Sequence, residues 1–285
     1  MTGMYFLLLG ATLLFAFQFL FSKLYNRSKG DGADAAFTFL MASEAVSFMF
    51  MLILSGFRLH FTWFSALLGA LYAINSTLFV YFGLKALSVT NLSVYSVFAM
   101  LGGMLLPSLV GILFYHEGLT WQKAGAAVLI IAAILLTVEK GKKGGKTAFF
   151  YYIAVFFFNG MAVVLSKIHQ SAPSLATDSE SFVAIYNLLT VFLCFGLYLL
   201  KFRSLPTVKG REFGCAAGYA LCCGVPNLML LIAMTRLPVS VQYPIVTGGV
   251  MFFSTAISLI MREKPSRRAI LAALVAFGAT VIIIL

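Results

Sequence analysis

Charged residues are scarce in this chain. Only 10% of its 285 residues are Asp, Glu, Lys or Arg, whereas 61% are hydrophobic. Soluble globular domains carry about a quarter charged residues. This composition therefore excludes a soluble globule and indicates a protein of the lipid bilayer. Acidic residues are the rarest of the charged ones, nine against 20 Lys and Arg.

Cysteine and histidine are also few, and nothing in their spacing resembles a metal or catalytic site. The three histidines fall at loops or at the ends of apolar runs, without HExxH, GxSxG or paired aspartates nearby. No GxxxxGK[ST] motif occurs either. The sequence thus predicts no enzyme activity, no cofactor and no metal. The cysteines are expected to be small buried hydrophobes: Cys194, Cys215, Cys222 and Cys223.

Apolar runs of about 20 residues fill most of the chain, long enough for a helix to cross ~30 Å of hydrocarbon. Alternation of period two is absent, which favours helices over a barrel. The first run begins at Tyr5 without a cleavage site after it and is expected to be a retained span. We predict an all-α membrane protein of ten transmembrane helices, at 4–24, 34–56, 64–84, 88–114, 120–139, 148–168, 182–201, 213–234, 237–261 and 266–285.

The sequence repeats itself. Ala86 aligns with Ala233, and Gly102-Gly103 aligns with Gly248-Gly249. Five spans per copy is an odd number, so the second copy must enter the membrane from the opposite side. Inverted repeats of this kind are typical of secondary transporters. The expected units are a first five-helix repeat over 1–139, a basic cytoplasmic linker over 140–147 and a second, inverted five-helix repeat over 148–285.

The positive charge gathers in alternate loops. All but four of the 20 Lys and Arg residues lie in the connections on one side, and the four exceptions are Arg58, Lys123, Lys167 and Arg236. The positive-inside rule places that side in the cytoplasm, with the amino and carboxyl termini outside (N-out and C-out). The net charge of +11 is thereby explained by orientation and not by a nucleic-acid partner. The compact loops favour a bacterial cytoplasmic membrane.

Glu44 is the sharpest functional candidate, because it lies near the middle of an apolar run. A carboxylate at the bilayer centre costs ~3 kcal/mol or more unless a partner or a watery cavity compensates it. The sequence leaves three roles open. Glu44 could couple transport to protons, pair with a cationic substrate, or accept a structural hydrogen bond from Ser47 or a neighbouring helix.

Other polar residues inside the runs complete the candidate site. Ser88, Asn91, Tyr95 and Gly102 recur at spacings that would place them on one face of a helix. Polar faces in a membrane bundle turn inward, where they either line a cavity or bond across helices. The full set of predicted substrate-binding or coupling residues is Glu44, Gln18, Asn75, Asn91, Tyr95, Asn159, Asn227, Tyr243 and Thr247.

Charged residues at equivalent ends of the two repeats are expected to be structural. Lys23 and Lys167 are predicted to extend to the membrane interface. Glu117 and Glu263 are predicted to cap helices or anchor their orientation. Gly224 to Asn227, with Pro226, is expected to interrupt its span.

Several segments resemble the drug/metabolite transporter superfamily, in its EamA-like branch. They include FAFQFLFSK at Phe15–Lys23, the stretch Ala86–Leu136 with its turn HEGLTWQKAG, and the weaker second copy ending the chain. The resemblance implies a ten-helix inverted-repeat bundle, a central substrate cavity and alternating access. Many relatives carry an arginine in the second span, where this chain has Glu44.

These observations predict a secondary active transporter of a small polar metabolite. Glu44 favours proton coupling or an amine-bearing or cationic substrate, since a phosphorylated one would need buried Arg or Lys at the midplane. An exchanger of a nucleotide-, sugar- or nucleobase-type metabolite is the alternative within this class. An intramembrane enzyme or a lipid-handling protein is the alternative outside it. The expected partners are a small-molecule substrate and the bilayer, with the chain as a monomer or homodimer.

Overall fold

The computed structural model describes residues 2–114, 120–137, 145–234, 239–263 and 265–282. Within these ranges the chain forms helices and no strand, as the composition predicts. The helices are α1 (Thr2–Lys29), α2 (Ala33–Leu54), α3 (Trp63–Val89), α4 (Leu92–Phe114), α5 (Trp121–Thr137), α6 (Gly145–Gln170), α7 (Ser179–Phe202), α8 (Gly210–Met234), α9 (Val239–Ile260) and α10 (Arg267–Ile282).

Among the residues that the structure describes, seven helices are long and apolar enough to cross a membrane. They are α1, α2, α3, α4, α6, α7 and α8, and each includes an apolar helical stretch of at least 21 residues. A shorter apolar helix covers Ile245–Ile260 in α9. Because a backbone in hydrocarbon must satisfy its own hydrogen bonds, such helices identify a multi-pass integral membrane protein.

Two of the expected helix limits are wrong. The predicted span 88–114 joined two helices, whereas Ser88 belongs to the end of α3 and α4 begins at Leu92. The side chain of Asn91 accepts a hydrogen bond from the backbone nitrogen of Val94 over 3.1 Å, so it caps α4. The predicted break near Pro226 is also absent, since α8 continues through this proline.

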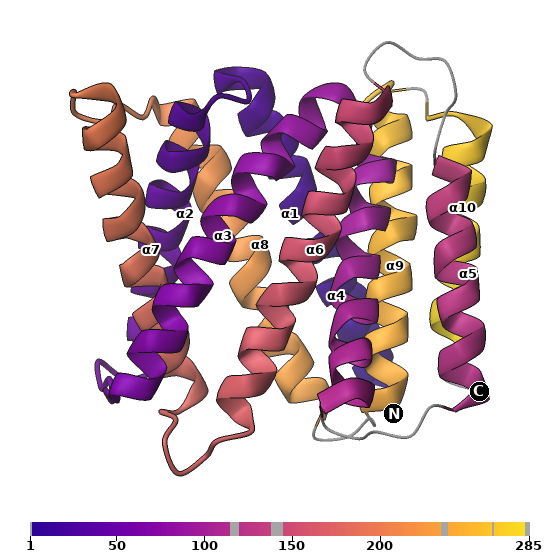
Figure 1. Ribbon diagram of the computed structural model, residues 1–285, viewed down its shortest axis with the longest axis horizontal. Coiled ribbons are helices and arrows are strands. Elements are labelled where there is room, and N and C mark those ends of the chain that lie inside the picture. The colour runs from indigo at the N-terminus through magenta and orange to yellow at the C-terminus, as the bar shows by residue number, and fades with distance from the viewer. Residues whose placement is uncertain (1, 115–119, 138–144, 235–238, 264, 283–285) are drawn as a thin grey trace.

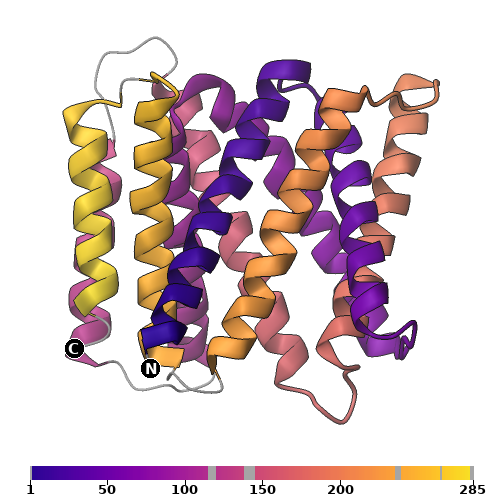
Figure 2. The same cartoon turned by 180° about the vertical axis from the view of Figure 1, so that it is seen from behind.

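The helices pack in a pairwise pattern. The first helix, α1, packs against α8 and α9, and α6 packs against α3 and α4. In addition, α2 packs against α7, and α5 against α10. Both views place α5 and α10 at one edge of the bundle and α2 and α7 at the other (Figures 1 and 2). The start of α1 and the end of α10 lie at the same end of the bundle, the lower one in Figure 1.

Glycines allow α4 and α6 to approach each other closely. A Cβ atom added to Gly102 of α4 would overlap the backbone carbonyl of Phe156 in α6, and one added to Gly160 would lie 2.6 Å from the carbonyl oxygen of Gly102. Backbones approach this closely in membranes only where small residues face each other. The Gly102 and Gly160 crossing therefore fixes how α4 and α6 pack.

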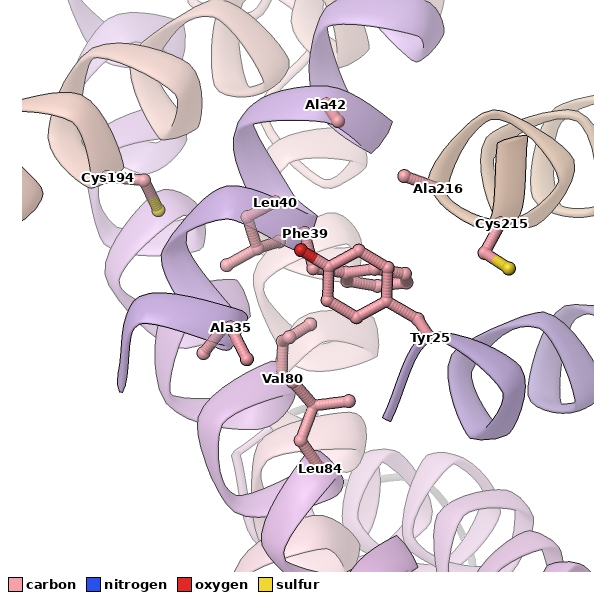
Figure 3. Close-up of a cluster of buried hydrophobic side chains, with 11 residues drawn as sticks. Tyr25, Ala35, Phe39, Leu40, Ala42, Val80, Leu84, Cys194, Cys215 and Ala216 are labelled. Atoms are coloured by element: carbon pink, nitrogen blue, oxygen red, sulfur yellow. The ribbon is translucent and has the colours of Figure 1, made fainter. Parts of the chain in front are cut away.

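A buried hydrophobic cluster holds α2 in place (Figure 3). Phe39 of α2 packs edge-to-face against Tyr25 of α1, with ring centroids 4.7 Å apart, and against Tyr219 of α8 at 4.9 Å. The hydroxyl of Tyr25 is hydrogen-bonded to Thr38 over 2.7 Å, so its polar group is satisfied. This cluster anchors the helix that carries Glu44.

Candidate functional site

Glu44 lies midway along α2 and faces α7. With its amide nitrogen toward Glu44, Asn187 of α7 donates to Oε2 over 2.7 Å and to the carbonyl of Val183 over 3.3 Å. The opposite orientation of the amide would set oxygen against oxygen. Asn187 is 1% exposed, whereas Glu44 is only partly buried. The carboxylate is thus held by a neighbouring helix.

Tyrosines of α3, α7 and α8 pack on the helices that hold this carboxylate. Tyr72 of α3 and Tyr186 of α7 stack, with centroids 4.0 Å apart and planes at 22°. Tyr186 directly precedes Asn187, the partner of Glu44, and Tyr219 of α8 packs against Phe39 of α2 at 4.9 Å. Aromatic faces attract cations, and hydroxyls supply hydrogen bonds.

Two predicted residues, Gln18 and Tyr95, lie beside this group. Gln18 of α1 is within hydrogen-bonding reach of Tyr219. Tyr95 of α4 is buried and packs edge-to-face against Phe19 at 5.3 Å. Tyr95 and Tyr219 both line a small pocket that also includes Ser22. The structure thus brings Gln18 and Tyr95 together beside Tyr219, which packs against Phe39 of the helix that carries Glu44.

Asn75 and Asn159 instead tie helices together. The side chain of Asn75 in α3 donates to the carbonyl of Phe158 in α6 over 2.9 Å. The side chain of Asn159 in α6 donates to the carbonyl of Ala99 in α4 over 2.6 Å. Polar residues in the bundle were expected either to line a cavity or to bond across helices, and both of these amides bond across helices.

Asn91 and Asn227 make hydrogen bonds near their own helix ends or within their own helix. Asn91 caps α4. Asn227 is exposed, and its side chain donates to the carbonyl of Cys223 on its own helix over 2.7 Å. Thr247 lies in α9, two residues before Gly249, which meets Thr12 of α1. The side chain of Tyr243 lies outside the described residues.

A buried ionic cluster lies at the end of the bundle that carries most of the basic loops. The Nζ atom of Lys23 lies 3.3 Å from Oε1 of Glu263 and donates to the carbonyls of Leu87 and Thr90 over 2.6 Å each. The other oxygen of Glu263 accepts hydrogen bonds from the backbone nitrogen of Leu92 and from a serine of α9. The expectation that Lys23 extends to the interface is wrong, because its side chain is 9% exposed. This cluster joins α1 to the α3–α4 turn and to the α9–α10 loop. Glu117, the counterpart of Glu263, lies outside the described residues.

Hydrogen bonds also join loops at the opposite end. Asp178 caps α7 by accepting from the backbone nitrogen of Ser181, and it lies 2.7 Å from Nδ1 of His60 in the α2–α3 loop. Burial acts to raise the pKa of Asp178, but the hydrogen bonds from His60 and Ser181 outweigh it and hold the pKa below its usual value. The loops before α3 and α7 are therefore fastened to each other.

Replacing Asp178 with Ala is expected to destabilise the protein by about 1 kcal/mol, because α7 loses its cap. Asp178→Asn keeps an acceptor and should be affected less. A carboxylate whose pKa is lowered on folding stabilises the protein above its unfolded pKa, and this stabilisation disappears as the pH falls through the folded value. In thermal unfolding, the gap between wild type and Asp178→Asn should therefore close below about pH 4. An unchanged gap at pH 3 would contradict the role of the charge.

Sequence reasoning missed Asn187, Tyr72, Tyr186 and Tyr219. Asn187 lies in an apolar run, as Asn75 does, and this signal could have selected it. Tyr72 and Tyr219 occupy matching positions of the sequence repeat, but aromatic residues are common in this chain, at 15%, so this match did not select them. Their relation to Glu44 depends on the packing of α3, α7 and α8 around α2.

Comparison with known proteins adds a likeness of fold. No protein-family model matches the sequence, and no curated protein matches it. Among solved structures, one described only as the crystal structure of a protein is similar, with a TM-score of 0.60 and 19% identity. The match covers 96% of this chain and 95% of that one. The arrangement of helices along nearly the whole chain therefore occurs in a solved structure.

Proposed function

We propose that this protein is a secondary active transporter that moves a small polar metabolite across the membrane by alternating access. Its ten helices would form two inverted repeats of five, as the drug/metabolite transporter superfamily and its EamA-like branch have them. Both termini would lie outside the cytoplasm, in accordance with the charge of the loops.

The observation that carries this proposal is the agreement between the sequence repeat and the helix pairing. If each helix is exchanged for its counterpart in the other repeat, the packing of α1 on α8 becomes that of α6 on α3. The packing of α1 on α9 likewise becomes that of α6 on α4, and the pairs α2 with α7 and α5 with α10 map onto themselves. Such pairing supports two repeats that can rock about a shared interface.

Glu44 supports an amine-bearing or cationic substrate, taken up with or against protons. It is a partly buried carboxylate near the middle of a membrane helix, and in the described part of the chain no Lys, Arg or His pairs with it. A carboxylate in this setting needs a cation or a proton for compensation. An incoming substrate ammonium group would supply the missing charge.

Counterflow in proteoliposomes tests the proposal. Vesicles containing the purified protein are loaded with an unlabelled primary amine, and uptake of the same labelled amine is measured with and without a pH gradient. A transporter of this class is expected to accelerate labelled uptake over empty vesicles, and loaded vesicles should exceed unloaded ones. Equal uptake by protein-containing and empty vesicles across amines, amino acids and nucleosides would overturn the proposed function.

A further inference from the structure

Three basic side chains in the last two turns of α1 bind carboxylates from the second half of the chain. The Nζ atom of Lys29 lies 3.4 Å from Oε2 of Glu212, in the first turn of α8. Lys23 and Arg27 lie 3.3 and 3.0 Å from Oε1 of Glu263, in the α9–α10 loop. These five residues, here called the α1 charge cluster, join the two expected repeats at the end of the bundle opposite the start of α1 (Figure 2).

The carboxylates of this cluster are shielded from water and fixed in place. The side chains of Glu212 and Glu263 are each 6% exposed. Both also accept hydrogen bonds from the backbone, Glu212 from the nitrogen of Lys209 over 3.0 Å and Glu263 from that of Leu92 over 2.8 Å. The cations of α1 therefore meet carboxylates whose positions are already set.

A buried ion pair responds to water differently from an apolar contact. Removing two charges from water costs about as much free energy as their attraction returns, so the pair and its separated, hydrated ions differ little. Apolar surface always loses free energy on exposure to water. An end joined by ion pairs is therefore able to open at low cost, provided that both charges become hydrated.

The opposite end of the bundle is joined without charge at the matching position. Ser65, in the first turn of α3, precedes Glu212 by the same number of residues that separates Tyr72 from Tyr219. The hydroxyl of Ser65 accepts from the backbone nitrogen of Thr177, in the α6–α7 loop, over 3.0 Å. Of these two matching positions, the one beside α1 carries the charge.

We propose that the α1 charge cluster is a latch, which keeps this end of the transport path shut and opens as its charges become hydrated. The inference rests on the proposed function, since it names the contacts that separate at one end during alternating access. Lys29 and Glu212 are the part of the latch that variants reach without disturbing the cluster around Lys23.

Two native cysteines report separately on opening and on unfolding. Cys215 lies one turn after Glu212 in α8, is 8% exposed, and belongs to the buried cluster that includes Tyr25 of α1 (Figure 3). Cys194 is fully buried in α7, which packs against α2 and α3. Separation of α1 from α8 would expose Cys215 and leave Cys194 buried. Labelling with N-ethylmaleimide in detergent, followed by mass spectrometry of peptides, gives the rate at each cysteine.

Lys29→Gln leaves Glu212 buried without its cation, and is expected to raise the labelling rate of Cys215 about 10-fold while that of Cys194 stays unchanged. The double variant Lys29→Gln with Glu212→Gln removes both charges and should return the rate toward that of wild type. Lys201→Gln makes the same change at an exposed lysine at the end of α7 and should have no effect.

An unchanged rate at Cys215 in Lys29→Gln would overturn the latch. Equal acceleration at Cys194 would also overturn it, because the whole bundle would then have loosened. The labelling needs no substrate, so it is independent of amine counterflow. If Cys215 is labelled faster in Lys29→Gln but wild type exchanges no substrate, the proposed function fails while the latch remains.

Discussion

Glu44→Gln is expected to weaken binding of ammonium probes by roughly 30-fold or more while the protein remains folded. Removing one member of a buried, hydrogen-bonded charge pair costs at least about 2 kcal/mol of binding free energy. The glutamine keeps an oxygen that can accept from Asn187, so the contact between α2 and α7 survives. Amine counterflow in proteoliposomes should fall to the level of empty vesicles.

The stability of the same variant separates a functional from a structural Glu44. A carboxylate near the bilayer centre costs ~3 kcal/mol, so its replacement by a neutral amide should leave thermal stability equal or higher. Glu180→Gln makes the same change at an exposed position in the first turn of α7, and it should alter neither binding nor stability. Wild-type amine binding by Glu44→Gln would refute the role of Glu44 as counter-ion.

Breaking the ionic cluster around Glu263 is expected to have the largest effect on stability. Glu263→Gln leaves the charge of Lys23 without its counter-ion, and loss of one partner of a buried pair typically costs about 3–5 kcal/mol. Lys23 Nζ retains its two carbonyl acceptors, so the lower end of this range is expected. Thermal unfolding in detergent measures the effect.

Arg27 provides the matched control for this cluster. It lies closer to Glu263 than Lys23 does, at 3.0 Å, but its side chain is 46% exposed. Exposed ion pairs contribute at most about 1 kcal/mol, so Arg27→Ala should be nearly neutral. The double variant Lys23→Met with Glu263→Leu removes both buried charges and should recover much of the stability lost by Glu263→Gln. If Arg27→Ala proved as damaging as Glu263→Gln, burial would not be the cause.

The sequence was a good guide to the class of the protein and to the positions of its helices. The length and apolarity of the runs give the all-helical, membrane-spanning class, because lipid leaves a backbone few alternatives. Where helices begin and end was less secure. The spacing of Asn91 predicted a residue on a helix face. Instead, its short side chain accepts a hydrogen bond from the backbone of Val94 and caps α4. Spacing alone does not show whether such a side chain bonds to the backbone at a helix start or lies within the helix.

Lys23, near the end of α1, shows that the position of a charged residue along a helix does not predict its partners. Lys23 has the spacing of a residue that extends to the interface, but Glu263 lies 240 positions later in the chain, and only packing brings the two together. The same holds for Asn75 and Asn159, whose amides find carbonyls on α6 and α4. A sequence shows that a polar group needs a partner, but not which one it has.

For Glu44, the sequence and the tertiary structure each determine a different property. The sequence by itself determined that this carboxylate requires compensation, since a carboxylate near the middle of an apolar run is costly unless a partner or water is present. The tertiary structure decided which group hydrogen-bonds to it, because Asn187 belongs to α7. Burial cost is local to one helix, whereas hydrogen-bond geometry arises only where helices pack side by side.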